Sequence, residues 1–544
     1  MAATSIEDLR QAKATFDPSL WGDTFSSFSL DDKVQETYAD AIDELKKEAK
    51  KMLMAAKSSK LLILIDTIER LGLAYHFEKE IQEKLQEIYD EFHANNYEED
   101  LFTIALGFRL LRQHRYHVSS GVFEKFTNKD KKFEETLIDN VEGLLNLYEA
   151  AHIRIHGEDI LEEAVTFTTH HLTRVLPQLE SPIKDKVKRA LEHPTHRAIP
   201  IIELRLYISI YEKDEPRDEV LLKMAKLNFN YLQNLYKDEL SQLSRWWNKF
   251  DLKSKLPYAR NRLIESFLWG ISFHFEPQYS QVRMAVAKSV NLVTIIDDTY
   301  DNYATLEEAQ LFSEILERWN MDQTERFPDW MKIAYQFVMS TYEDYEHDAT
   351  KQEKPFAIPY FKEAVKQIAL AYNKELKWIV KRELPSFEEY YANSVITSCL
   401  FVLFTAHFPG MKSVTKETID WLLSEPKIVI TAAKIGRYYN DLASNERENM
   451  GGKQLTVMDC YMKEHGVSKQ EACSKFAELI EEGWKDLNTE WITKTHSIPE
   501  HILVQLLNYV REARATYNNG EDRVTNPQVL VPCIHALFVE PIVV

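Results

Sequence analysis

The sequence predicts an all-α protein made of two helical domains. Glycine is scarce, with 14 among 544 residues, and strand-like alternation of apolar and polar residues is hard to find. Apolar residues recur at helical spacing instead, as at Ala41, Leu45 and Ala49, with charged residues between them. The same spacing covers 81–92, 220–232, 306–319, 360–380 and 471–487. Prolines fall between many such segments, so we expect helices of roughly 10–20 residues joined by short loops.

The length of the chain predicts the division into two domains. Single hydrophobic cores stop growing at about 250–300 residues, and this chain has 544. The polar stretch 212–218 contains Pro216 and is the best candidate for a boundary. We therefore expect an N-terminal domain of residues 1–218 and a C-terminal domain of residues 219–544.

Charge and composition exclude several classes of protein. The net charge of -20 argues against a nucleic-acid partner, because phosphate binding needs clustered Lys and Arg. No apolar run approaches the ~20 residues that cross a bilayer, and the N-terminus has neither a secretory nor a transit pattern. The four cysteines lack zinc spacing, which predicts reduced thiols. We expect a cytoplasmic protein without a membrane span.

An aspartate-rich segment predicts a magnesium site. Asp297, Asp298 and Asp301 follow the largely apolar run 290–296. On a helix, positions 297 and 301 share one face, with 298 beside them. Three neighbouring carboxylates repel one another unless a cation lies between them, and oxygen ligands suit Mg²⁺, which is often shared with a substrate phosphate. The alternative is an exposed acidic helix end.

A second cluster predicts an opposing metal position. Asn440, Ser444 and Glu448 lie at i, i+4 and i+8, so on a helix they form one stripe of oxygen ligands. Alone, such a stripe is more often a solvated helix face. Arg437, one turn earlier, would point the same way and could clamp a diphosphate oxygen.

Two further arginines could contact the same anion. Arg260 and Arg262 stand two positions apart and cannot share one helix face, so a loop or a helix start is expected there. In such a place they could wrap a leaving diphosphate. The pattern is weak by itself.

The whole chain resembles the plant class I terpene synthases, and within them the cytosolic sesquiterpene synthases. The two metal motifs carry part of this resemblance. The other motifs are FDPSLWGD at 16–23, RLGLAYHF at 70–77, FRLLR at 108–112, PYARNR at 257–262 and FEPQYS at 275–280.

The resemblance implies a fold and a reaction. The implied fold is a C-terminal α-bundle that holds the site, preceded by a barrel-like helical domain without activity of its own. The N-terminal region has no D-x-D-D motif, so the reaction is expected to start by metal-triggered ionisation. The expected substrate is farnesyl diphosphate, the product a C15 hydrocarbon or alcohol, and the state a monomer. Three Mg²⁺ ions are implied, for which Mn²⁺ can substitute.

The resemblance also implies roles for single residues. Metal ligands would be Asp297, Asp298, Asp301, Asn440, Ser444 and Glu448. Arg260 and Arg437 would bind diphosphate, and Arg262 would help to close the site. The pocket would be lined by Trp269 and Tyr517, and by Thr397, Ser398 and Cys399, which fall where the family breaks a helix. Asp522 would lie near Tyr517, and the loop 518–527 would act as a lid. Asn440 cannot act as a base, so no general base is assigned.

Several alternatives stay open at this stage. Monoterpene synthases carry an arginine pair shortly before the tryptophan that corresponds to Trp21. In this chain Gln11 and Ala12 stand at those two positions, which favours farnesyl diphosphate over geranyl diphosphate as the substrate. A monoterpene synthase acting on geranyl diphosphate is the first alternative. A chain-elongating prenyltransferase normally carries two aspartate-rich motifs, and an inactive helical scaffold should have lost metal ligands. The product skeleton is not fixed by the sequence.

Overall fold

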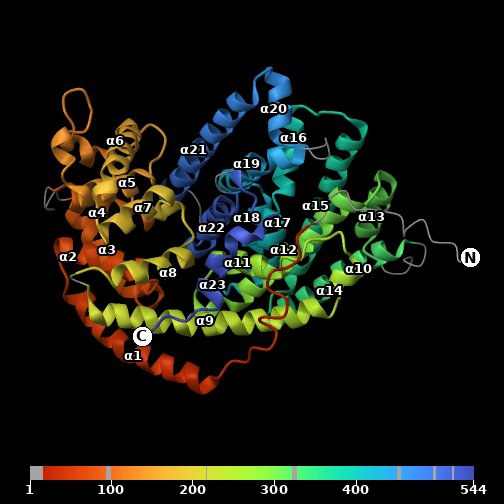
Figure 1. Ribbon diagram of the computed structural model, residues 1–544, viewed down its shortest axis with the longest axis horizontal. Helices are drawn as coiled ribbons and strands as arrows, with labels where there is room; N and C mark the ends of the chain where they lie inside the picture. The colour runs from red at the N-terminus through yellow and green to blue at the C-terminus, as the bar shows by residue number, and fades with distance from the viewer. Residues whose placement is uncertain are drawn as a thin grey trace, which may run out of the picture. The chain divides into compact units, whose positions relative to one another are not determined.

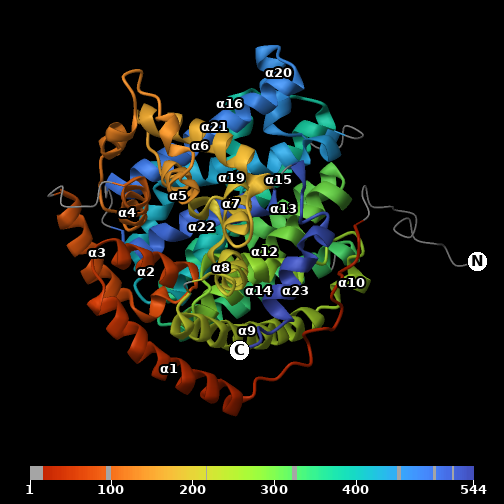
Figure 2. The same cartoon turned by 60° about the vertical axis from the view of Figure 1, so that its left-hand side comes forward.

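The computed structural model confirms the predicted all-α class. It describes residues 16–93, 100–215, 217–320, 327–449, 455–493, 498–517 and 520–544, without the side chains of 445–449. Over these residues the regular structure is helical, and β-type pairing is limited to an isolated bridge between Thr127 and Phe133. Figures 1 and 2 show the helices from two directions.

The chain divides into two compact units, each assembled from pieces that are distant in sequence. One unit comprises Met1–Ser29, Lys237–Ile480 and Pro499–Ile534, and the other Leu30–Tyr236, Glu481–Ile498 and His535–Val544. We call the first the pocket unit, since it contains the cavity described below, and the second the outer unit. The predicted boundary between residues 218 and 219 immediately precedes a long helix, α9 (Glu219–Asn248), and stays a prediction.

The outer unit contains the early helices. They are α1 (Asp32–Ala55), α2 (Ser58–Arg70), α3 (Glu78–His93), α4 (Leu101–Gln113), α5 (Val141–Ala151), α6 (Asp159–Val175), α7 (Ile183–Glu192) and α8 (Pro200–Tyr211). Neighbours along the chain pack on one another, as α4 does on α5 and α5 on α6. Single 3₁₀ turns join several of these helices.

The pocket unit contains most of the later helices. They are α10 (Leu252–Lys255), α11 (Leu263–Phe273), α12 (Ser280–Asp298), α13 (Leu306–Arg318), α14 (Asp329–Lys351), α15 (Ile358–Lys381), α16 (Phe387–Thr397), α17 (Leu400–His407), α18 (Lys416–Leu423), α19 (Lys427–Asn449), α20 (Val457–His465) and α22 (Glu500–Thr516). The helices α9, α21 (Lys469–Thr493) and α23 (Val531–Phe538) each contribute residues to both units.

The core of the pocket unit is built on α12. This helix packs against α11, α14, α15 and α17, and α19 packs against α22 (Figure 1). Burial follows from composition, because α11 is apolar on nearly all sides and is buried along nearly its whole length. A capping box, in which Thr305 and Glu308 bond reciprocally, fixes the start of α13. Several of these helices line the cavity described below.

One apolar stretch of the described residues, Phe387–Gly410, is long and apolar enough to cross a membrane by length and composition alone. It is 67% buried inside the protein. The structure divides it into α16 and α17, which are separated at Cys399, where φ is +68° in the left-handed region. The two parts are core helices of the pocket unit, and the break between them lines its cavity.

Candidate active site

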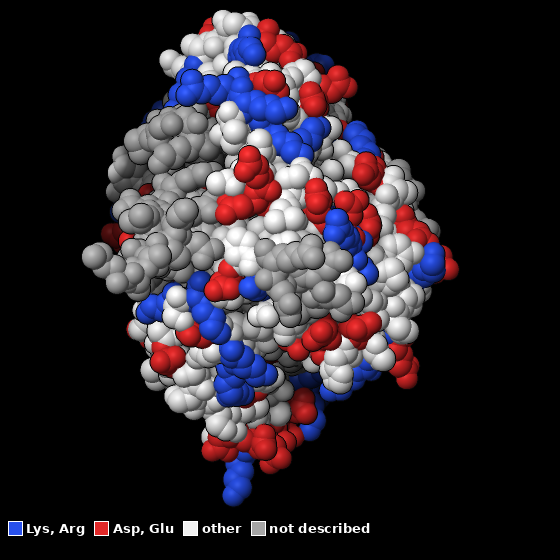
Figure 3. Space-filling model, turned by 90° about the vertical axis from the view of Figure 1, so that its right-hand side faces the viewer, with Lys and Arg blue, Asp and Glu red and all other residues white. Residues whose placement is uncertain are grey.

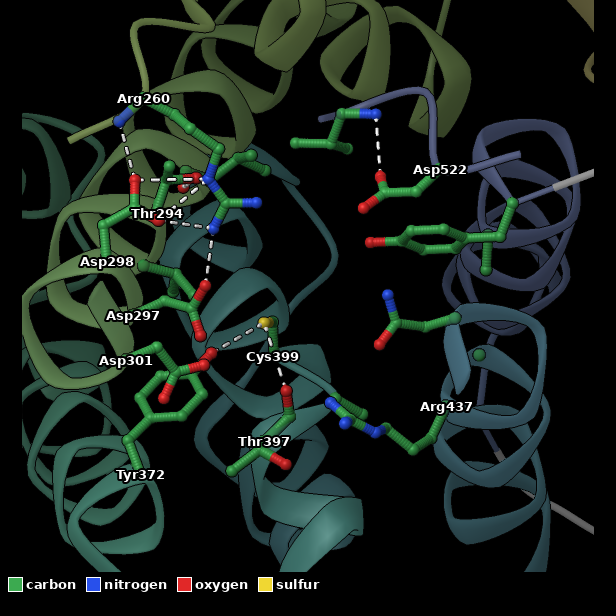
Figure 4. Close-up of a pocket in the computed structure, with 18 of the residues that line it drawn as sticks. Arg260, Thr294, Asp297, Asp298, Asp301, Tyr372, Thr397, Cys399, Arg437 and Asp522 are labelled. Atoms are coloured by element: carbon green, nitrogen blue, oxygen red, sulfur yellow. Dashed lines mark hydrogen bonds and ion pairs between the residues drawn. The ribbon is translucent and has the colours of Figure 1, made fainter. Parts of the chain in front are cut away.

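A cavity in the pocket unit brings most of the predicted site residues together. It encloses about 1280 Å³ of space, part of it open to solvent. Twelve of the predicted residues line it: Arg260, Trp269, Asp297, Asp298, Asp301, Thr397, Ser398, Cys399, Arg437, Asn440, Tyr517 and Asp522. Figure 4 shows labelled members of this set reaching into the cavity from several helices.

The aspartate-rich segment forms one wall. It begins at the end of α12, and a π-helical turn, η8 (Thr299–Tyr303), follows directly. Single π-helical turns are frequent at functional sites. Asp297 and Asp301 are partly exposed towards the cavity, whereas Asp298 is only 2% exposed.

Arg260 holds the two adjacent aspartates. It lies in the loop before α11, and its Nη2 donates to Asp297 Oδ2 at 2.6 Å. Its backbone N–H donates to Asp298 Oδ2 at 2.6 Å and its Nε to Asp298 Oδ1 at 2.9 Å. Burial raises the pKa of Asp298 to about 6, while the neighbouring Arg260 acts to lower it. Asp298 thus positions Arg260 as well as carrying charge.

The helix α19 forms the opposing wall. Gly436, Arg437 and Asn440 line the cavity. Nε of Arg437 lies 2.7 Å from Oδ1 of Asp441, which is fully buried and accepts a hydrogen bond from the Val457 backbone N–H at 2.7 Å. This ion pair fixes the base of the Arg437 guanidinium, whose other end reaches the cavity (Figure 4).

Three predicted residues do not line the cavity as it is described. Ser444 is fully buried on α19, and its Oγ has no hydrogen-bond partner in the described structure. The side chain of Glu448 lies outside the described residues. Arg262, the residue that caps α11, is 1% exposed and bonds to backbone carbonyls instead.

The contacts of Arg262 tie together two distant segments of the pocket unit. Its Nη1 donates to the carbonyl of Asp17 at 2.9 Å, and its Nε donates to the carbonyl of Val524 at 2.7 Å. Val524 belongs to the predicted lid 518–527, of which residues 518 and 519 lie outside the described residues. Within this loop, Asp522 Oδ1 accepts the backbone N–H groups of Val524 and Thr525, at 3.0 and 3.1 Å.

The break between α16 and α17 supplies polar groups at the floor of the cavity. The hydroxyl of Thr397 donates to Glu375 Oε1 at 2.9 Å, and the carbonyl of Ser398 accepts the hydroxyl of Tyr509 at 2.8 Å. Burial raises the pKa of Glu375 to about 7 and that of Cys399 to about 12. Both side chains are therefore neutral over part or all of the physiological range.

The rest of the lining is apolar and aromatic. Trp269 from α11 lies edge-on to Tyr509 of α22, with ring centroids 6.2 Å apart. Aliphatic side chains complete the surface: Val290, Val293, Ile379, Leu403, Leu455 and Val524. Aromatic faces can stabilise a cation by up to about 2 kcal/mol when desolvated. Such a lining suits a reactive cation that must be kept from water.

Sequence reasoning missed several lining residues. Tyr372, Glu375 and Tyr509 face the cavity, yet none belongs to a recognised motif. Each lies in a long helix, α15 or α22, at a position that looks like ordinary core. A buried glutamate within an apolar stripe was the one available signal, because buried carboxyl groups need partners.

The residues present fit a metal ion shared with a substrate. Five carboxyl side chains line the cavity, at Asp297, Asp298, Asp301, Glu375 and Asp522, against the two guanidinium groups of Arg260 and Arg437. The buried, unpartnered Ser444 hydroxyl is a further oxygen one turn beyond Asn440. Among the described side chains, no three His, Cys, Asp or Glu groups converge as a closed metal site. Mg²⁺ usually keeps waters and takes substrate phosphate oxygens, so an open site is what it needs.

The fold and the cavity define an all-helical enzyme in which two walls with carboxyl and guanidinium groups enclose an aromatic-lined pocket. Residues 248–486 match the metal binding domain of the terpene synthase family, and residues 20–191 match the terpene synthase N-terminal domain. The chain belongs to the terpene synthase family. It is therefore a lyase that acts on diphosphates, and the predicted family, enzyme class and metal-binding character are confirmed.

Named relatives cover the whole chain. It is 54% identical to the gamma-cadinene synthase of Ocimum basilicum over 547 residues, which is 100% of both chains. It is 55% identical to the gamma-curcumene synthase of Pogostemon cablin, over 98% of each. Among solved structures, isoprene synthase from grey poplar (Populus x canescens), in complex with three Mg²⁺ ions and dimethylallyl-S-thiolodiphosphate, is 33% identical. It has a TM-score of 0.89 and covers 94% of this chain and 98% of that one.

Proposed function

We propose that the protein is a sesquiterpene synthase that ionises farnesyl diphosphate, cyclises the resulting carbocation and releases a C15 hydrocarbon or alcohol. The observation that carries the proposal is the full-length identity of 54–55% with two synthases named for such products. The aromatic and aliphatic lining of the cavity supports it, because a hydrocarbon chain must be folded there away from water.

The two walls of the cavity would bind the metal ions together. Asp297, Asp298 and Asp301 on one wall, with Asn440, Ser444 and Glu448 on the other, would hold magnesium, and Asp298 would also fix Arg260. By analogy with the structure that contains three Mg²⁺ ions, we propose three here. Bound magnesium supplies neutralisation of the charge that develops on the leaving diphosphate.

The chain's own cations and pocket groups would complete the site. Arg260 and Arg437 would bind the diphosphate oxygens, since guanidinium groups match phosphate geometry. Arg262 would keep the lid segment against the N-terminal segment through the Val524 and Asp17 carbonyls. Trp269 would face the cation, Tyr517 and Asp522 would border the pocket near the lid, and Thr397, Ser398 and Cys399 would present polar groups from the helix break.

Other properties follow from the same proposal. The catalytic domain would be residues 219–544 and the supporting domain residues 1–218. We propose a cytoplasmic monomer without a membrane span or a nucleic-acid partner. On the face that Figure 3 shows, groups of Lys and Arg are interspersed with groups of Asp and Glu. The anionic substrate would thus be attracted mainly by the cations within the pocket.

The test is a substrate assay with mass spectrometry of the volatile products. The purified protein is incubated with Mg²⁺ and, separately, geranyl, farnesyl or geranylgeranyl diphosphate. A C15 product from farnesyl diphosphate is expected, and product from geranyl diphosphate alone would show a monoterpene synthase instead. A chelator should abolish turnover, and added Mg²⁺ should restore it. Absence of product from all three substrates would refute the proposal.

A further inference from the structure

A tyrosine that no motif identified connects three elements of the cavity. Tyr509 of α22 is 2% exposed, lines the cavity and donates its hydroxyl to the carbonyl of Ser398 at 2.8 Å. Ser398 caps the C-terminus of α16, and the last carbonyls of a helix have no partner within that helix. The hydroxyl of Tyr509 therefore satisfies a carbonyl whose dipole lies beside the pocket.

The position of this ring depends on a glycine of the facing helix. A Cβ atom built on Gly436 of α19 would lie 2.5 Å from the hydroxyl oxygen of Tyr509 and 2.8 and 2.9 Å from two of its ring carbons. Glycine inside a helix is unfavourable by about 1 kcal/mol relative to alanine. Because Gly436 has no side chain, the ring of Tyr509 can occupy the space beside it.

Two neighbouring rings contact the ring of Tyr509. Trp269 lies 6.2 Å from it edge-on, and Phe404 lies 6.5 Å from it, also edge-on, measured between ring centroids. Trp269 itself lines the cavity. A displacement of Tyr509 would therefore change both the shape of the pocket and the exposure of the Ser398 carbonyl.

We propose that Gly436, Tyr509 and the carbonyl of Ser398 form a latch that determines which products the enzyme makes. With the latch closed, the Tyr509 hydroxyl engages the Ser398 carbonyl and the ring fixes the contour next to Trp269. With the latch open, the carbonyl dipole is free to stabilise a cation at a different carbon. The inference rests on the proposed cyclisation of farnesyl diphosphate and concerns partitioning after ionisation.

Two single substitutions test the latch from opposite sides. Tyr509→Phe removes the hydroxyl and keeps the ring, whereas Gly436→Ala adds the atom that the ring excludes. Each should change the ratio of products from farnesyl diphosphate by roughly 2- to 10-fold, the equivalent of one hydrogen bond. In Tyr509→Phe, KM should change less than the product ratio, because the lost hydrogen bond is to the Ser398 carbonyl and not to the proposed diphosphate ligands. An unchanged product ratio in Tyr509→Phe would overturn the proposal.

A double substitution shows whether the two positions act together. In Tyr509→Leu the ring is absent, so adding Gly436→Ala should have little further effect on the product ratio. An equal effect of Gly436→Ala with and without the ring would also overturn the latch. If the unmodified enzyme makes no product from farnesyl diphosphate, the proposed function itself fails, and that outcome is distinct.

The outer unit offers a matched control. Gly107 of α4 is another helical glycine, and a Cβ there would overlap the ring of Phe92. Gly107→Ala should lower the melting temperature by an amount similar to Gly436→Ala while leaving the product ratio unchanged. A comparable shift of the product ratio in Gly107→Ala would show that general loosening, and not the latch, governs selection.

Discussion

Buried charges occur in both units of the protein, but they are balanced differently. In the outer unit, Asp66 accepts hydrogen bonds from Arg70 at 3.0 Å and from Arg109, which is 1% exposed. Glu149, also close to Arg70, accepts the backbone N–H and the hydroxyl of Thr195, both at 2.8 Å. Two arginines thus face two carboxyl groups, and each carboxyl group has partners.

The cavity of the pocket unit has an excess of carboxyl groups instead. Its lining contains five of them and two guanidinium groups. A balanced buried set gives the protein a fixed structure, whereas an excess of negative charge facing a cavity calls for cations from outside. This difference in charge balance distinguishes residues that stabilise the fold from residues that take part in catalysis. Substitutions at Asp301, Arg109 and Glu375 test it.

The largest effect is expected for an aspartate of the cavity wall. Asp301→Asn removes one negative charge and one metal ligand, so kcat for farnesyl diphosphate should fall by roughly 1000-fold, the equivalent of about 4 kcal/mol. The measurement is the steady-state rate at saturating Mg²⁺, with circular dichroism to confirm the fold. Asp329→Asn, at an exposed helix start in the same unit, is the control. Turnover of Asp301→Asn within about tenfold of the unmodified enzyme would contradict its metal role.

A smaller effect, on stability alone, is expected for an arginine of the outer unit. Arg109→Met removes a buried guanidinium and leaves the partly buried Asp66 with one arginine partner. This change should destabilise the protein by about 3 kcal/mol. The measurement is the denaturant midpoint, followed together with activity because two units need not unfold as one. The product ratio of the folded enzyme should not change. A changed ratio would show that this set also shapes the pocket.

The smallest effect concerns the pH dependence of stability at Glu375. Burial raises the pKa of this glutamate from 4.5 to about 7, so between these values the folded state binds more protons than the unfolded state. Stability from this group is therefore present at low pH and is lost as the pH rises through about 7. Glu375→Gln should remove this loss. The gain in the free energy of unfolding over the unmodified protein should therefore be about 2 kcal/mol greater at pH 8 than at pH 5.

Glu512 provides the comparison for Glu375. It is also buried, with its pKa raised to about 7, and it is not among the lining residues of the cavity. Glu512→Gln should flatten the pH dependence of unfolding in the same way and leave the product ratio unchanged. If neither substitution alters the pH dependence of unfolding, burial does not raise the pKa of these two carboxyl groups, and the prediction is wrong.

The helices were predictable because their apolar spacing is regular. The predicted segments 81–92, 306–319 and 360–380 correspond to α3, α13 and α15, with ends within a few residues. The break at Cys399 came only through the family resemblance, since the apolar composition of 387–410 runs through it without a glycine or proline at the break. A left-handed residue there is held by tertiary packing, which local sequence does not encode.

The cavity was predictable only where charge and motif marked it. Asp297, Asp301, Asn440 and Arg260 stand out in sequence because charged and polar side chains at such spacing suit metal and phosphate binding. Tyr372, Glu375 and Tyr509 do not, because an aromatic or a glutamate on an amphipathic helix is ordinary until its neighbours are known. Gly436 has a meaning only next to Tyr509, and that contact joins two different helices.

The hydrogen bonds of Arg262 to Asp17 and Val524 can form only in sequence while the chain is being synthesised. Its carbonyl partners, Asp17 and Val524, flank it by 245 and 262 residues of chain. A ribosome adds about 5–20 residues per second, so tens of seconds separate the emergence of Arg262 from that of Val524. During this interval the N-terminal segment has part of its docking site and the cavity lacks its rim. The cavity can therefore be completed only after Val524 has been synthesised, long after the helices of the outer unit have left the ribosome.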